Sequence, residues 1–154
     1  MDTPKPKTMQ PNQTTTLTTA TAIQELVDEF RDRTLPAEKW THEAHLTTAV
    51  WFLANHPKNE AICYLRSGII SYNVSVGGQN TPTGGYHETI TLFWIEIIDR
   101  FVSEHPDLKL PELCNAFLSS DFASKDLPMR YYSRELLFST RARAVWVEPD
   151  LEEL

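Results

Sequence analysis

Residues 86–104 read Tyr-His-Glu-Thr-Ile-Thr-Leu-Phe-Trp-Ile-Glu-Ile-Ile-Asp-Arg-Phe-Val-Ser-Glu and carry the strongest structural signal in the sequence. Apolar residues recur at helical spacing and form a wide stripe on one side of a helix: Ile90, Phe93, Trp94, Ile97, Ile98 and Phe101. Pro106 ends the pattern. A helix with so wide an apolar stripe must bury it against other elements, so this segment largely decides the fold class.

Neighbouring segments repeat the helical spacing, whereas the alternation typical of strands is nearly absent. We therefore predict an all-α fold, an antiparallel helical bundle with four principal helices plus short C-terminal helices and an extended tail. The first predicted helix begins near Thr19 and is ended by Pro36. The others cover Pro36 or Thr41 to Asn55, Asn59 to Asn73, Pro111 to Leu118, and Ser133 to Phe138 with a continuation at Thr140 to Val145.

Length and composition indicate one globular domain. The 154 residues suffice for a single core, with residues 1–18 expected as a disordered polar arm and 19–154 as the helical domain. The net charge of −7 disfavours non-specific binding to nucleic acid or an anionic membrane surface. No signal peptide or membrane span is recognisable, so we expect a cytoplasmic protein. Cys63 and Cys114 are expected as buried free thiols, and a homodimer is one option for the assembly.

Residues 74–85 form the longest irregular stretch within the predicted domain and contain four of the five glycines. Long ordered loops in compact domains are often functional. The alternative is a flexible crossover between antiparallel helices, and the sequence does not separate the two.

Histidines provide the best candidate for a functional site. His42 and His45 are three residues apart, which places their rings about 60° from each other on one side of a helix. His87 opens the helix of residues 86–104, and if Gly85 is its N-cap, His87 lies in the first turn. The positive end of a helix disfavours imidazolium, so a neutral ring with a free lone pair is expected.

Three neutral imidazoles with an open position are typical of a catalytic zinc site or of another divalent metal site. We therefore interpret His42, His45 and His87 as metal ligands for zinc, iron, nickel or manganese, with Glu43 or Glu88 as a further ligand or proton shuttle. A metal-free polar site and purely structural histidines are the alternatives. His56 and His105 each precede a proline and are predicted to cap helix ends.

Tyrosine and asparagine side chains surround the glycine-rich stretch. Tyr86 is a candidate catalytic residue, and Tyr72, Asn73 and Asn80 are candidates for contacts to a substrate. Core packing is the alternative for Tyr72, Asn73 and Tyr86.

Residues 125–143 hold five basic residues against two acidic ones, an excess of three positive charges within an acidic protein. Arg130, Tyr131 and Arg134 could present guanidinium groups and a phenol to a carboxylate or phosphate. The alternative is a segment that wraps the bundle and pairs its arginines with acidic helices.

The stretches Trp40-Thr41-His42-Glu43-Ala44-His45-Leu46 and Gly85-Tyr86-His87-Glu88-Thr89, with the tail of residues 131–151, resemble an uncharacterised family of bacterial proteins of similar length. That resemblance implies a shared helical fold and no particular activity. Trp40-Thr41 and His45-Leu46 are more loosely similar to the DinB/YfiT-like metal-dependent bundles. This second resemblance implies that His45 is a metal ligand, although the later pair of histidines four residues apart in those proteins is replaced here by His87 alone.

Three functions are compatible with these features. The first is a metal-dependent enzyme acting on a small polar substrate at the three histidines. The second is a non-catalytic helical module that binds an anionic metabolite or a partner protein through the glycine-rich loop and the basic segment. The third is a structural subunit whose histidines are simply buried.

Overall fold

The computed structural model describes residues 18–154, which contain helices and no β-strand. The predicted arm of residues 1–18 lies outside the described residues except for Thr18, whose backbone N–H donates to Asn115 Oδ1 over 2.9 Å. The helices are α1 (Ala20–Asp32), α2 (His42–Asn55), α3 (Lys58–Ser75), α4 (Glu88–Glu104), α5 (Leu110–Leu118), α6 (Pro128–Tyr131), α7 (Arg134–Leu137) and α8 (Thr140–Ala144). The prediction of an all-α helical bundle is confirmed.

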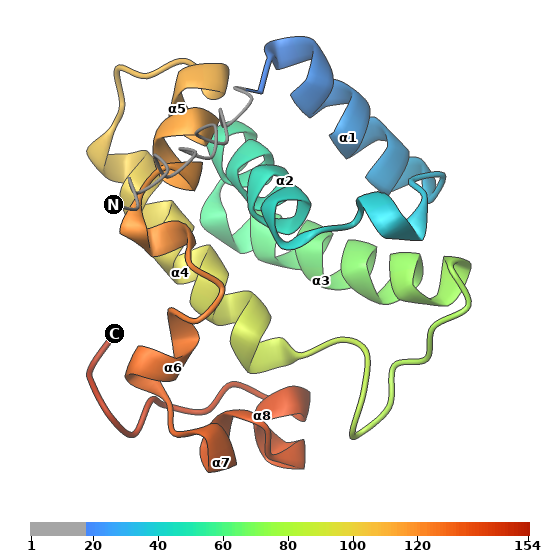
Figure 1. The fold of residues 1–154 in the computed structure, drawn as a ribbon, viewed down its shortest axis with the longest axis vertical. Helices are drawn as coiled ribbons and strands as arrows, with labels where there is room; N and C mark the ends of the chain where they lie inside the picture. Colours follow the sequence, from blue (N-terminus) through green and yellow to red (C-terminus); the bar gives the residue numbers. More distant parts are fainter. Residues whose placement is uncertain (1–17) are drawn as a thin grey trace, which may run out of the picture.

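Helix α2 is the centre of the bundle (Figure 1). It contacts α1, α3, α4 and α5, and eight of its fourteen residues are buried. A helix surrounded in this way needs small or apolar side chains on nearly all sides, and the sequence from Ala44 to Leu53 supplies them. Helices α6–α8 gather beyond the first turns of α4, at the end of the molecule that also carries the loop between α3 and α4 (Figure 1).

Aromatic side chains fill the contact between α1, α2 and α3. The Phe30 ring stacks on Trp40 with 4.8 Å between centroids and lies 6.0 Å from the Tyr72 ring. Gly68 in the middle of α3 makes room for this group, since a Cβ atom there would lie 2.7 Å from Phe30 Cζ. The glycine therefore permits close approach of α1 and α3, which offsets its low helix propensity.

Helix boundaries agree with the sequence within a few residues, except at the start of α4. The sequence suggested Gly85 as the N-cap, but His87 is the N-cap and its Nδ1 accepts the backbone N–H of Ile90 over 3.1 Å. Gly85 lies outside the helix at φ +76°, where a Cβ atom would meet Gln79 O at 2.4 Å. The short helix α6 was not predicted, because its four residues are too few to show a period.

The C-terminal tail lies along the start of α4. Thr89 Oγ1 donates to Val145 O over 2.9 Å and accepts the backbone N–H of Val147 over 3.2 Å. Further along the tail, the Leu151 N–H donates to Tyr131 O over 2.9 Å. These bonds join the tail and α6 to the bundle, so the last residues of the chain contribute to the surroundings of α4.

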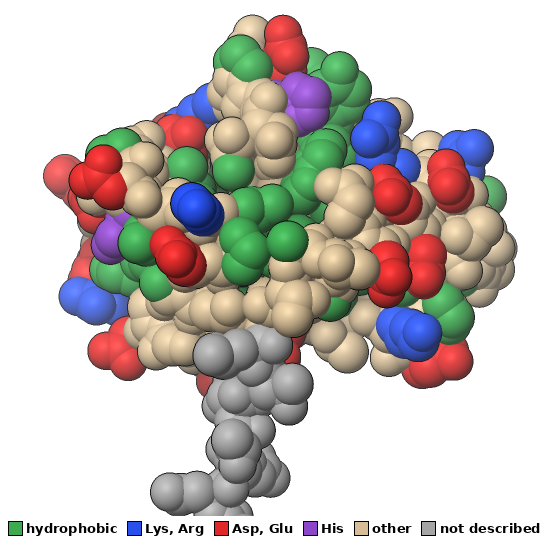
Figure 2. Space-filling view, turned by 90° about the horizontal axis from the view of Figure 1, so that it is seen from above, with side chains coloured by type: hydrophobic (Ala, Val, Ile, Leu, Met, Phe, Trp, Pro, Cys, Tyr) green, Lys and Arg blue, Asp and Glu red, His purple; other side chains and the backbone are tan. Residues whose placement is uncertain are grey.

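Surface composition varies over the molecule. On the face shown in Figure 2, hydrophobic side chains gather near the middle, and charged side chains of both signs lie toward the edges. No helix among residues 18–154 is long and apolar enough to cross a membrane. Cys114 is buried as predicted, which raises the pKa of its thiol to about 12, whereas the expected burial of Cys63 is wrong, since Cys63 is exposed on the outer side of α3.

Candidate functional site

His45 is oriented by the first turn of α2. Thr41 is the N-cap, and its Oγ1 accepts the backbone N–H of Ala44 over 3.2 Å. The Thr41 carbonyl lies 2.7 Å from His45 Nδ1, and because a carbonyl can only accept, Nδ1 carries the hydrogen. In the neutral ring the lone pair is then on Nε2, which has no hydrogen-bond partner among the described residues and is not among the fully buried polar atoms.

Burial is the main reason that the pKa of His45 is lowered. The hydrogen bond to Thr41 raises the pKa and the nearby His42 lowers it further, with burial the largest of the three effects. The ordinary value is 6.5, so the ring is neutral at neutral pH. His45 therefore presents a hydrogen-bond acceptor, or a base, at Nε2.

His42 lies one turn away on the same helix. Its Nε2 donates to Ala123 O over 2.8 Å, by the same carbonyl argument, and its ring lies 5.3 Å from the Trp94 ring of α4. A neutral His42 thus has its lone pair on Nδ1, for which no partner is found among residues 18–154. The prediction that these two rings share one side of the helix agrees with their common position on the wall of a cavity.

That cavity has a volume of about 320 Å³ and lies between α2, α3 and α4. His42 and His45 stand on one wall with Trp40 beside them, and Thr91 is on α4. The remaining lining is apolar: Leu46, Ala49, Leu65, Ile69, Ile90, Trp94 and Ile95. A concave, mostly apolar space with a few polar groups on one wall is the usual form of a small-molecule site.

Trp40 packs beside His45 at this wall. The centroid of its ring lies 3.9 Å from that of the His45 ring, and it also stacks on Phe30. Its Nε1 is fully buried and has no hydrogen-bond partner among residues 18–154, which is uncommon for a buried donor. Because this N–H is not accessible from the cavity, Trp40 contributes its aromatic ring to the wall.

His87 lies close to this site but its ring nitrogens are both engaged. Nε2 donates to Leu137 O over 2.7 Å, while Nδ1 accepts the N–H of Ile90. Burial is the main reason that the pKa of His87 is lowered, and Arg143 contributes in the same direction. The ring is therefore neutral and has no free lone pair for a metal. It shares with His45 the lining of a neighbouring hollow of about 450 Å³.

The structure does not assemble the predicted metal centre. Within residues 18–154, no group of three or more His, Cys, Asp or Glu side chains is arranged to hold a metal ion. His87 is a helix cap that joins α4 to α7, and only His42 and His45 share the cavity of α2. The residues present therefore do not fit the metal that the DinB/YfiT-like resemblance implies.

The two predicted carboxylates lie apart from the cavity. Glu43 is exposed and lines a groove on the other side of α2, near α1. Glu88 is buried and forms an ion pair with Arg66, whose Nε lies 3.1 Å from each carboxylate oxygen. The Tyr86 hydroxyl donates a hydrogen bond to Glu88 Oε2 over 2.5 Å. Burial and Glu88 raise the pKa of this hydroxyl, so Tyr86 is a weak acid that does not readily release its proton.

Two of the three candidate substrate contacts near the loop have a structural role. Tyr72 is 1% exposed, and its hydroxyl donates to Leu35 O over 2.9 Å within the core. Asn80 anchors the glycine-rich loop, because its Oδ1 accepts the N–H of Tyr86 and its Nδ2 donates to Ile70 O. Asn73 also donates to Asn80 Oδ1, over 3.1 Å, and lines the hollow next to His87.

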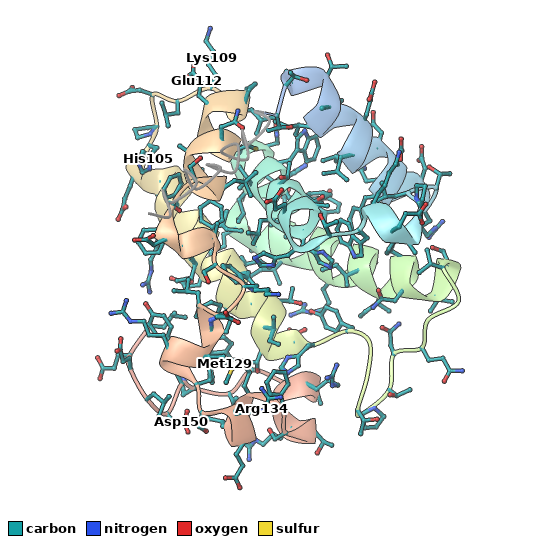
Figure 3. The ribbon with its side chains drawn as sticks, in the orientation of Figure 1. His105, Lys109, Glu112, Met129, Arg134 and Asp150 are labelled. Carbon is teal, nitrogen blue, oxygen red and sulfur yellow. The ribbon has the colours of Figure 1, made fainter. Side chains whose placement is uncertain are left out.

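The predicted basic residues at the C-terminus lie at the far end of the molecule. Arg130 pairs with Glu152 over 3.0 Å, and Arg134 lies over the Phe138 ring at 5.1 Å. Tyr131 contacts Phe93 with 5.4 Å between ring centroids. Figure 3 shows Arg134 and Asp150 at the end formed by α6–α8, opposite to His105, which caps α4 as predicted. His56 likewise caps α2.

Three residues of the sites gave no separate signal in the sequence. Trp94 is one residue of the apolar stripe of residues 90–101, Trp40 entered only through the two resemblances, and Arg66 was not singled out. Only the crossing of α2, α3 and α4 brings the two tryptophans to one cavity. The unusual position of Trp40, between a helix break and a histidine, is the one clue that could have directed attention to it.

Comparison of the chain with protein-family models, with curated proteins and with solved structures finds no match. The two resemblances drawn from the sequence therefore stay predictions. The candidate site accordingly depends on its own geometry, that of the α2 cavity with His42 and His45 on its polar wall.

Proposed function

We propose that the protein binds a small, largely apolar molecule that carries one hydroxyl or amine group in the cavity of α2. The observation that supports this most is the accessible Nε2 of a neutral His45 on the wall of an otherwise apolar cavity. A molecule placed there gains from burial against the aliphatic side chains, and its polar group gains from a directed hydrogen bond.

The polar wall determines which group it accepts. Nε2 of the neutral His45 ring is an acceptor, so it favours a ligand O–H or N–H. A carboxylate would place its own lone pairs against that of Nε2. A neutral alcohol or phenol therefore fits this wall better than an anion.

The metal-dependent enzyme inferred from the sequence stays a prediction. The engaged nitrogens of His87 give it no support, and the arrangement of His42 and His45 alone matches a metal-free polar site. If chemistry occurs in the cavity, His45 is the residue placed to accept a proton from the bound hydroxyl group.

Three probes of similar size test this proposal: 2-naphthol, naphthalene and 2-naphthoate, each titrated into the full-length chain by calorimetry. We expect 2-naphthol to bind more tightly than naphthalene, and 2-naphthoate to bind most weakly. In the His45→Leu variant the preference for 2-naphthol over naphthalene should fall by about tenfold, the value of one hydrogen bond lost from a buried site.

Two further variants define the site. Ala49→Leu fills the cavity and should weaken binding of both 2-naphthol and naphthalene, because Ala49 lines it. Glu43→Gln, on the same helix but facing the other groove, is the matched control and should leave both affinities unchanged. Absence of binding, or an unchanged preference in a folded His45→Leu variant, would refute the proposal.

A further inference from the structure

A second hollow, of about 780 Å³, lies between α3, the glycine-rich loop and α8. None of the residues that line the α2 cavity lines this one. Three arginines from two distant parts of the chain meet here: Arg66 of α3, and Arg141 and Arg143 of α8. Such a concentration of guanidinium groups contrasts with the net charge of −7 of the whole chain.

The positive charge of Arg66 is compensated by Glu88 within this groove. Arg66 binds Glu88 through Nε and Nη2, a two-point contact between guanidinium and carboxylate. Glu88 itself is buried, and it also accepts a hydrogen bond from the Tyr86 hydroxyl. The carboxylate is therefore compensated, and Glu88 contributes little net negative charge to the groove.

The other two arginines have no acidic partner among residues 18–154. Arg143 Nη1 donates to Gly85 O over 2.9 Å and to Tyr86 O over 3.4 Å, and both partners are uncharged carbonyls. Its Nε and Nη2 remain available as donors. Arg141 is exposed, and its side chain makes no ion pair or hydrogen bond within that part of the chain. Two positive charges are thus uncompensated in one groove.

The loop opposite these arginines is held in one conformation. Asn80 is fixed by hydrogen bonds to Ile70 O and to the N–H of Tyr86. Gly85 adopts φ +76° with Asn80 Oδ1 only 2.8 Å from where a Cβ atom would be, so this turn needs glycine. The Gly85 carbonyl in turn positions Arg143. A groove built in this way is formed before a ligand arrives, which reduces the entropic cost of binding.

From these observations we infer that the groove is an anion site for the phosphate group of a small molecule, bound by Arg141 and the free donors of Arg143. Guanidinium groups match the oxygens of a phosphate in pairs, and the neighbouring Thr140 hydroxyl can add a further donor. This site does not depend on the function proposed for the α2 cavity, since the two share no lining residue.

Inorganic pyrophosphate is the probe, titrated into the full-length chain by calorimetry at low ionic strength. We expect saturable binding that Arg141→Gln weakens by about tenfold, as for the loss of one charge-assisted contact. The Arg141 side chain has no partner among residues 18–154, so this variant should unfold at the same temperature as the wild type.

The matched control is Arg134→Gln, which removes the same charge from the adjacent helix α7 but lies over Phe138, outside the groove. It should leave the affinity for pyrophosphate within about twofold of wild type, since only long-range electrostatics would change. No saturable binding of pyrophosphate, or equal weakening by the two variants, would overturn the inference.

Discussion

His87 offers the most direct test of the structure, because the sequence and the fold assign it different roles. As the N-cap of α4 it accepts the N–H of Ile90, and it donates to the Leu137 carbonyl of α7. His87→Ala removes a cap, which costs about 1 kcal/mol. It also leaves the Leu137 carbonyl without its donor. Because the His87 side chain is only 7% exposed, this loss costs a further ~1–3 kcal/mol. The free energy of unfolding should therefore fall by about 2–4 kcal/mol.

His87→Asn separates the two contributions, because asparagine is a good N-cap but is too short to reach Leu137. We expect it to be more stable than His87→Ala by about 1 kcal/mol and less stable than wild type. The measurement is urea unfolding at neutral pH, followed by circular dichroism. Equal stability of the two variants, or both within about 0.5 kcal/mol of wild type, would refute the capping role.

The same samples address the metal prediction. A metal ligand at position 87 would make the unfolding midpoint of the wild type rise with equimolar zinc, and the rise would disappear in His87→Asn. Because both ring nitrogens are engaged in hydrogen bonds, we expect zinc to leave both midpoints unchanged.

Stability should decrease as the pH falls below about 6.5, because the folded pKa values of His45 and His87 are lowered and the unfolded chain therefore takes up protons first. Urea midpoints measured from neutral pH down to about pH 5 check this, and the dependence should be smaller in His87→Asn. Tyr72→Phe leaves the Leu35 carbonyl without its donor and should lower the free energy of unfolding by about 1–2 kcal/mol. It should leave 2-naphthol affinity unchanged, and weaker binding without loss of stability would instead return Tyr72 to the ligand site.

Helices were predictable because their signal is local. The apolar stripe of residues 90–101 and the proline at 106 fix the type and end of α4 without reference to any other element. Gly68 shows the limit of local signals, because only the structure identifies Phe30 as the side chain that approaches it.

The histidines were only partly predictable. Their spacing correctly placed His42 and His45 on one wall, since three residues are nearly one helical turn. The assignment of His87 to the same ligand set assumed that adjacent helices would bring the rings together. The actual start of α4, one residue after His87, instead turns that ring toward its own helix and toward α7.

The arginines of the C-terminal segment show the same limit. The sequence indicated an excess of positive charge, but it favoured Arg130 and Arg134, which pair with Glu152 and Phe138. Arg141 and Arg143 instead face the glycine-rich loop and Arg66. A charge count identifies a basic segment, whereas the path of the chain after α6 determines which charges remain uncompensated.

By itself, then, the sequence determined the all-α class, the longer helices and the caps at His56 and His105, because each depends on side chains within a few residues of one another. Tertiary structure decided which side chains share a cavity and which hydrogen bonds occupy each ring nitrogen, because those depend on helix crossings between distant segments. The sequence around His42, His45 and His87 gives little reason to assign them different roles. Their carbonyl partners at Thr41, Ala123 and Leu137 give them different roles.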